Sequence, residues 1–144
     1  MDLQLSPASN CDAPFASALT KDNMHTYYER YDTQWSSEGF LQEWSTLESY
    51  IIFKADIQVG FLSLSVNSPH LYIRDIQLTK EHTGQGIGTW AISQIATIAK
   101  RQNLQYLRLK VFNDNPAKFL YQRLGFLVVG TEPNLLRMER GVNP

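Results

Sequence analysis

Residues 71–88 read LYIRDIQLTKEHTGQGIG, a run of apolar, β-branched and aromatic residues followed by a loop with three glycines. The run up to Leu78 has the composition of a strand. After the loop, apolar residues recur at helical spacing, at Ala91, Ile95, Ile98 and Ala99. This stretch therefore predicts a strand, a glycine-rich loop and a helix in direct succession.

Two further strands are expected before this stretch, at Tyr50–Lys54 and Val59–Val66. Short turns separate the three runs, which favours an antiparallel meander. Within Val59–Val66, Leu62, Leu64 and Val66 alternate with Phe61, Ser63 and Ser65, so we expect one face of this strand to be better buried than the other.

The first part of the chain predicts two helices. Thr20 is a candidate N-cap for a helix with an aromatic face formed by Met24, Tyr27, Tyr28 and Tyr31. Ser37 is a candidate cap for a second helix, and the link between the two carries Trp35. Residues up to Leu19 have no sustained periodicity and are expected to form a strand or an arm.

The elements after the central helix make the sheet mixed. Leu107–Val111 alternates as a strand, and a strand, helix and strand of this length need a parallel crossover. Asn115 as N-cap and Pro116 at the first helical position predict a helix ended by Gly125. Strands at Phe126–Gly130 and Arg137–Arg140 complete an α/β fold of the α+β type, a mixed, mainly antiparallel sheet with about four helices.

Composition limits the function classes. The chain has 144 residues, 43% of them hydrophobic, which suits a single domain over residues 1–144. Lys and Arg number 13 against 14 Asp and Glu, so no net positive field favours nucleic acid. Cys11, the only cysteine, permits no intrachain disulfide and no CxxC metal site. We expect no metal, no membrane segment, no signal peptide and a cytoplasmic location.

The glycine loop points to anion binding, because glycines let main-chain N–H groups converge ahead of a helix N-terminus. A Walker loop is excluded, since no Lys-Ser or Lys-Thr follows. Gly86 to Ala91 fits the dinucleotide pattern GxGxxA, but Arg108 and Lys110 stand on the strand where that pattern needs an acidic residue. A plain tight turn stays open as the alternative.

Leu71–Gly88, Asn115-Pro116-Ala117 and the later run LYQRLGF (120–126) together resemble the GNAT superfamily of acyl-CoA-dependent N-acetyltransferases. That family has an R/Q-x-x-G-x-G/A loop after its fourth strand and an Asn-Ala helix with a Leu-Tyr pair and a Gly-Phe end. Thr83 departs from the pattern, because it stands where the family has Arg or Gln. We expect this change to reshape the pyrophosphate contacts rather than abolish them.

The resemblance implies acetyl-CoA as co-substrate and a set of residues that bind it. The main chain of Ile76, Gln77 and Leu78 would pair with the pantetheine arm as an added strand. Pyrophosphate would lie on amides of the loop and the helix start, together with a contact from Asn115; the loop residues are Thr83, Gly84, Gln85, Gly86, Ile87, Gly88 and Thr89.

The catalytic residues implied by the resemblance are Tyr121, which would protonate the leaving thiolate, and Asp75, which would act as base directly or through water. A packed core tyrosine and a structural aspartate are the alternatives. Arg74 stands beside Asp75 where some family members have a second acidic residue. His70 and Glu38 are weaker candidates for the base.

Acceptor recognition is expected from the first two helices and their link, with Tyr27 and Trp35 as an aromatic wall, and Tyr28 and Tyr31 mainly in the core. The predicted function is direct acetyl transfer to a primary amine. A noncatalytic acyl-CoA-binding module and a nucleotide-dependent oxidoreductase are the alternatives. A homodimer is an expectation from the family resemblance.

Overall fold

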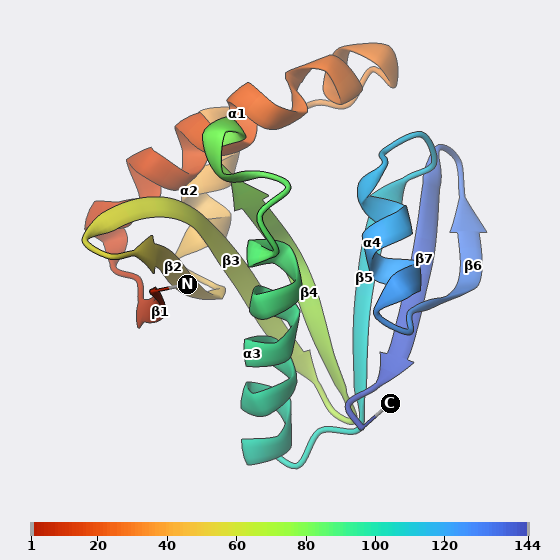
Figure 1. Ribbon diagram of the computed structural model, residues 1–144. Coiled ribbons are helices and arrows are strands. Elements are labelled where there is room, and N and C mark those ends of the chain that lie inside the picture. The colour runs from red at the N-terminus through yellow and green to blue at the C-terminus, as the bar shows by residue number, and fades with distance from the viewer. Residues whose placement is uncertain (1, 144) are drawn as a thin grey trace. The chain divides into compact units, whose positions relative to one another are not determined.

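The computed structural model describes residues 2–143. The strands are β1 (Leu3–Pro7), β2 (Glu48–Lys54), β3 (Ile57–Asn67), β4 (His70–Leu78), β5 (Tyr106–Phe112), β6 (Leu127–Glu132) and β7 (Leu135–Gly141). The helices are α1 (Ala13–Arg30), α2 (Ser37–Trp44), α3 (Ile87–Arg101) and α4 (Ala117–Arg123), with short 3-10 turns η1 (Asn10–Asp12) and η2 (Lys80–His82). Figure 1 shows these elements in chain order.

The seven strands form one sheet in the order β1-β2-β3-β4-β5-β7-β6. β4 and β5 are parallel, and their register runs from His70↔Tyr106 to Ile73↔Leu109. β1 with β2, β2 with β3, β5 with β7 and β6 with β7 are antiparallel. The prediction of a mixed, mainly antiparallel sheet with four α-helices is confirmed.

The chain divides into two compact units. The first unit extends to Leu64 and includes Asp75–Gln85, and the second contains Ser65–Arg74 and the chain from Gly86 onward. The expectation of one domain over residues 1–144 stays a prediction. No helix within residues 2–143 combines the length and the apolar character that a membrane span requires.

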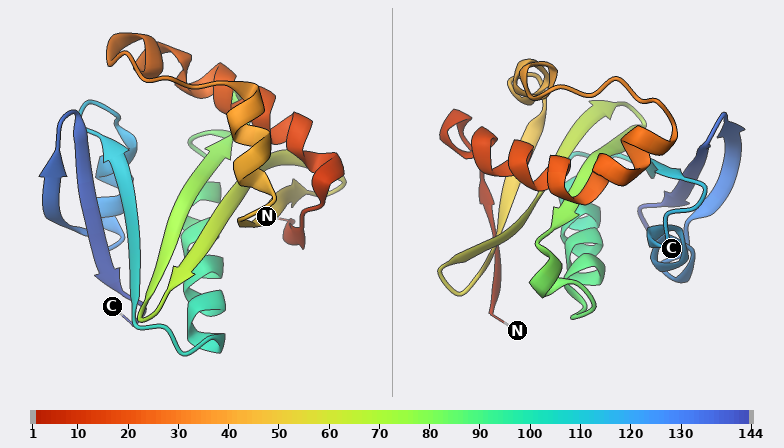
Figure 2. Two further views of the ribbon diagram at one scale, coloured as in Figure 1. Left: turned by 180° about the vertical axis from the view of Figure 1, so that it is seen from behind. Right: turned by 90° about the horizontal axis from the view of Figure 1, so that it is seen from above.

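In the first unit, α1 and α2 lie on β2 and β3 (Figure 2). Their shared core includes Ala16 and Leu19 of α1, Trp44 of α2, Ile51 of β2 and Phe61 of β3. The helix α1 begins at Ala13, earlier than the cap predicted at Thr20. The Thr20 hydroxyl donates instead to the Ala16 carbonyl within the helix (2.8 Å).

Two further local expectations were wrong in the first unit. Val59–Leu64 is buried at every position, so β3 has no better-exposed face there. The buried hydroxyls of Ser63 and Ser49 satisfy each other (2.7 Å), which allows a polar residue on that face. The cap of α2 is Ser36 rather than Ser37, because the Ser36 hydroxyl accepts from the Gly39 N–H (3.0 Å).

In the second unit, β5, β7 and β6 lie side by side, and α3 and α4 both contact β5 (Figure 1). The helix α4 begins one residue later than predicted, with Pro116 as the cap. Asn115 still contributes, because its Oδ1 accepts from the Ala117 N–H (2.9 Å). The helix ends before Gly125, as predicted, and Gly125 has a left-handed backbone (φ 95°).

Candidate active site

The glycine loop leads directly into the start of α3. Gly84 and Gly86 both have left-handed backbone, with φ of 73° and 84°. At the N-terminus of α3, the first helical hydrogen bond is the one that the Trp90 N–H donates to the Gly86 carbonyl (3.1 Å). The amides of Ile87, Gly88 and Thr89 precede it, and first-turn amides have no acceptor inside their own helix. These donors, together with the helix dipole, suit a phosphate group.

Hydrogen bonds of the Thr83 and Gln85 side chains stabilise the glycine loop in the first unit. The Thr83 hydroxyl donates to the Lys80 carbonyl (2.8 Å), and the Gln85 amide donates to the Glu81 carbonyl (3.1 Å). Lys54 Nζ donates to Gln85 Oε1 (3.1 Å). Thr83 therefore stabilises its own turn, and anion binding here would rest on main-chain N–H groups.

The end of β4, which includes Ile76, is held closely by its neighbours in the first unit. A side chain at Gly60 would overlap the Gln77 carbonyl and Leu78, so β3 comes very near β4 at this point. Asn23 of α1 donates to the Leu78 carbonyl (2.9 Å) and to Gln77 Oε1 (3.1 Å). These contacts fix the backbone that an added strand would use.

Asp75 is a carboxylate with a strongly altered proton affinity. Its pKa is raised from 3.8 to about 6. Burial is the main cause, the hydrogen bond from Gln77 (2.8 Å) opposes it, and the charge of Glu43 adds to it. The neighbouring charge is therefore another carboxylate. A base with a pKa near 6 is ionised at neutral pH and can accept a proton.

A row of aromatic rings from α1, α2 and their link lies in the same unit. Trp35 stacks on Tyr28 (ring centroids 6.1 Å apart, planes at 15°) and contacts Phe40 (6.2 Å). Phe40 continues the row to Trp44 and Phe61 (5.9 and 6.1 Å). Tyr27 lies beneath the Arg30 guanidinium, 5.6 Å from its ring centre.

Tyr28, expected mainly in the core, is only partly buried. Its pKa is raised by burial and then by the charges of Asp75 and Glu43. The charge of Glu43 therefore acts on both Tyr28 and Asp75, and the charge of Asp75 also acts on Tyr28. Tyr28 thus belongs with Trp35 to a region that combines aromatic rings and negative charge.

Tyr121 and Asn115 are placed by α4 in the second unit. The Tyr121 ring packs edge-on against the Phe126 ring, with the ring centroids 5.8 Å apart. The backbone carbonyl of Tyr121 accepts a hydrogen bond from the Phe126 N–H (3.0 Å). The side chain is partly buried. Leu120 of the same helix is the neighbour that a side chain at Gly88 would meet (3.0 Å), so α4 approaches the start of α3 closely.

The weaker candidates have structural partners. His70 Nε2 lies 3.2 Å from Glu139 and its ring stacks on Tyr106. Glu38 is exposed in the first turn of α2. Within residues 2–143 no group of three or more His, Cys, Asp or Glu side chains is arranged to hold a metal ion.

Three residues of this region were not singled out from the sequence. They are Glu43, whose charge acts on Asp75, and Asn23 and Gly60, which hold the end of β4. Glu43 lies one position before Trp44 on the second predicted helix, and no local pattern in the sequence marks it. Its charge acts on Asp75 only in the folded chain, and residue spacing alone does not predict this.

Solved structures share this fold over nearly the whole chain. The PaiA N-acetyltransferase of Thermoplasma acidophilum, in complex with coenzyme A, has a TM-score of 0.77 at 19% identity, covering 98% of this chain and 99% of that one. The dodecameric spermidine N-acetyltransferase of Vibrio cholerae has a TM-score of 0.78 at 19% identity, covering 99% and 95%.

Sequence relatives point the same way. Streptothricin acetyltransferase of Streptomyces lavendulae is 34% identical over 79 residues, which make up 53% of this chain. This chain covers only 42% of the length of that relative. Residues 16–126 match the Acetyltransferase (GNAT) family as a whole. The loop, the fold and this match together establish that the chain belongs to the GNAT acetyltransferase family.

Proposed function

We propose that this protein transfers an acetyl group from acetyl-CoA directly to a primary amine. The observation that carries the proposal is the glycine turn at Gly84 and Gly86, which opens α3 within a chain of the GNAT family. Left-handed glycines at both positions present consecutive main-chain donors ahead of a helix of 15 residues.

Acetyl-CoA would be held mainly by the backbone. Amides from Thr83 to Thr89 bind the pyrophosphate, and the main chain of Ile76–Leu78 pairs with the amides of the pantetheine arm. Asn115 adds a side-chain contact. The close approach of β3 at Gly60 and the Asn23 bond to Leu78 support this role, because they fix the end of β4 before any ligand arrives.

Asp75 and Tyr121 would move the protons of the reaction. The acceptor ammonium first loses one proton to solvent, because only the neutral amine has the lone pair that attacks the carbonyl carbon. Asp75 accepts a second proton from this nitrogen as its bond to the carbonyl carbon forms, when the nitrogen is far more acidic than a free ammonium. Tyr121 donates its hydroxyl proton to the sulfur as the carbon–sulfur bond breaks. Solvent then returns a proton to Tyr121 and accepts the one held by Asp75.

The acceptor is proposed to be a cationic amine. Asp75 and Glu43 supply negative charge, while Tyr28, Trp35 and Tyr27 supply aromatic faces, and both features stabilise an ammonium group. The partly buried position of Asp75 makes this attraction stronger than at a fully exposed carboxylate.

Two measurements test the proposal. Calorimetric titration with acetyl-CoA should give micromolar binding, corresponding to about -8 kcal/mol, whereas NAD used as the control should not bind. A panel of amines should then release free coenzyme A thiol in an amine-dependent manner. Binding without turnover on any amine would leave a noncatalytic acyl-CoA-binding module, and preference for NAD would refute the assignment.

Tyr121→Phe separates catalysis from binding. We expect turnover to fall at least about tenfold while affinity for coenzyme A changes by less than about threefold, because only proton donation is removed. Unchanged turnover would exclude Tyr121 from the mechanism. The cytoplasmic location and the homodimer stay predictions.

A further inference from the structure

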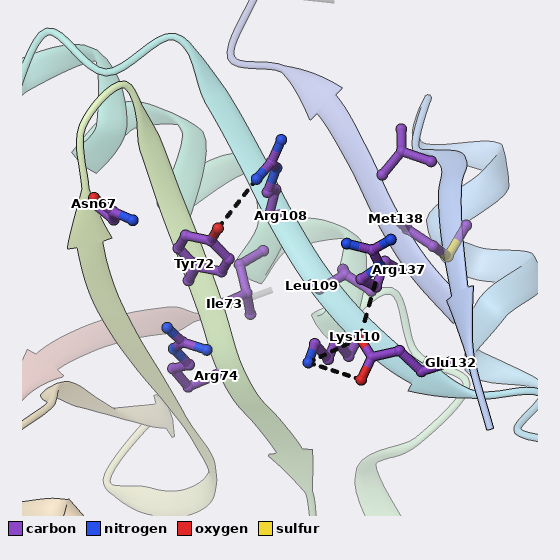
Figure 3. A pocket seen from close by; sticks show the side chains of 11 residues that line it. Asn67, Tyr72, Ile73, Arg74, Arg108, Leu109, Lys110, Glu132, Arg137 and Met138 are labelled. Atoms are coloured by element: carbon purple, nitrogen blue, oxygen red, sulfur yellow. Dashed lines mark hydrogen bonds and ion pairs between the residues drawn. The ribbon is translucent and has the colours of Figure 1, made fainter. Parts of the chain in front are cut away.

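The second unit contains a cavity of about 510 Å3 that the proposed transfer reaction does not use. Strands β4 to β7 and the end of β3 line it (Figure 3). Its charged and polar side chains include Tyr72, Arg74, Arg108, Lys110, Glu132 and Arg137. Four cations and one carboxylate therefore face one space, although the whole chain has a net charge of -1.

Arg108 is the cation with the most complete set of partners. Its Nε donates to Glu139 Oε1 (2.6 Å), and its Nη1 donates to the Tyr72 hydroxyl (3.1 Å). The bonds to Tyr72 and Glu139 raise the pKa of the guanidinium above its ordinary value. Arg108 therefore fixes one wall of the cavity and is largely neutralised by Glu139.

Lys110 and Arg137 share a single carboxylate. Lys110 Nζ lies 3.0 Å and Arg137 Nε 3.6 Å from the same oxygen of Glu132. Both cationic side chains are about half exposed, at 50% and 51%. One negative charge for two positive charges leaves this side of the cavity with an excess of positive charge.

Arg74 is held by neutral groups. Its Nε donates to the Ser65 hydroxyl (2.7 Å), and its guanidinium lies over the Tyr72 ring, 4.5 Å from the centre. Among residues 2–143 no carboxylate is paired with it. The guanidinium is therefore positioned by the fold but keeps its charge uncompensated.

The backbone of β6 makes room for this arrangement. The register with β7 shifts between Val128↔Met138 and Gly130↔Arg137, so Val129 is the extra residue of a bulge and lines the cavity. A side chain at Gly130 would overlap the Arg137 guanidinium. Gly130 thus lets Arg137 lie flat against the strand, which is the second feature that shapes the cavity.

We propose that this cavity binds a small organic anion through a carboxylate or phosphate group. Arg74, Lys110 and Arg137 supply the charge, because Arg108 is already compensated by Glu139. Guanidinium groups present paired N–H donors that match either oxyanion. Val129 and the Tyr72 ring offer apolar surface for the body of the ligand.

The proposal can be tested by NMR titration of the full chain with inorganic phosphate and, separately, with succinate. Ionic strength is held constant, and saturating coenzyme A is present so that the glycine loop is occupied. We expect amide shifts at Tyr72–Arg74, Arg108–Lys110 and Val129–Arg137. The two probes identify which oxyanion is preferred. No saturable shifts at these residues with either probe would overturn the proposal.

Variants sharpen the assignment. Arg74→Gln and Arg137→Gln should each weaken binding of the better probe at least about tenfold, whereas Arg101→Gln, an exposed cation at the end of α3, should not change it. Gly130→Ala should also weaken binding, since it displaces the Arg137 guanidinium without changing charge. Equal affinity in all variants that keep the wild-type amide spectrum would refute the site.

Discussion

Two regions of the molecule concentrate charge of opposite sign. Two consecutive residues of β4, Arg74 and Asp75, belong one to each region. Asp75 belongs to a region of the first unit in which the neighbouring charge is another carboxylate, Glu43. Arg74 belongs to a cavity of the second unit in which cations outnumber carboxylates. In each region the folded chain concentrates one sign of charge instead of cancelling it. Such concentrations cost free energy on folding, and they mark both regions as candidate sites for ligands of opposite charge.

The largest expected effect comes from removing the charge of Asp75. Asp75→Asn keeps the shape and the bond from Gln77 but cannot accept a proton, so we expect kcat to fall about 100-fold, the lower range for loss of a general base. Steady-state kinetics with the best amine would measure it. Asp56→Asn, at an exposed turn of the same unit, is the control and should keep full activity. Loss of less than threefold would remove Asp75 from the role of base.

The same substitution should stabilise the protein at neutral pH. The folded pKa of Asp75, about 6, lies above its ordinary 3.8, so the native state holds the proton more tightly and stability falls as pH rises from 4 to 6. Asp75→Asn removes this cost, and we expect about 1–3 kcal/mol greater stability at pH 8 and no difference below pH 4. Urea unfolding at both pH values would measure it. A gain that is equal at both pH values would contradict the electrostatic origin.

The fold and the glycine loop were predictable because their signals are local. A strand, two left-handed glycines and a periodic helix follow one another in the sequence, and each is determined by near neighbours. The start of α1 was not predicted, because its signal is not local. Ala13–Leu19 has few large apolar residues, and it is helical because Ala13, Ala16 and Leu19 pack against strands that come later in the chain.

The electrostatics of the two regions could not be predicted, because they depend on tertiary contacts. Glu43 acts on Asp75 across more than thirty positions of the chain, and Arg108 and Lys110 resemble an ordinary solvated strand face. Their cavity is also lined by Val129, at the bulge of β6, and by Glu132 and Arg137 of the strands β6 and β7. A bulge has no reliable signature in a short apolar run.

A smaller effect tests how Glu43 controls the acidic region. The charge of Glu43 raises the pKa of Asp75, so Glu43→Gln should lower that pKa. We expect the rising limb of kcat/KM to lie near pH 6 in the wild type and at lower pH in this variant. The substitution should also weaken the binding of a dicationic amine more than it weakens the binding of a monocationic amine. A pH–rate series with each amine measures both effects. Glu38→Gln, exposed on the same helix, is the control, and a limb shifted equally by both substitutions would show a general field effect instead.

The smallest effect is expected in the basic cavity. Glu132 is the carboxylate shared by Lys110 and Arg137, and both cations are half exposed. Exposed ion pairs contribute little, so Glu132→Gln should change the free energy of unfolding by less than about 0.5 kcal/mol. The same substitution leaves both cations uncompensated, and anion affinity should rise about threefold at low salt and converge with the wild type as salt increases. Phosphate or succinate titrations at two ionic strengths would measure this. Weaker binding in Glu132→Gln would mean that the carboxylate positions the cations for the ligand instead of competing with it, and the contrast between the two regions would then rest on geometry and not on net charge.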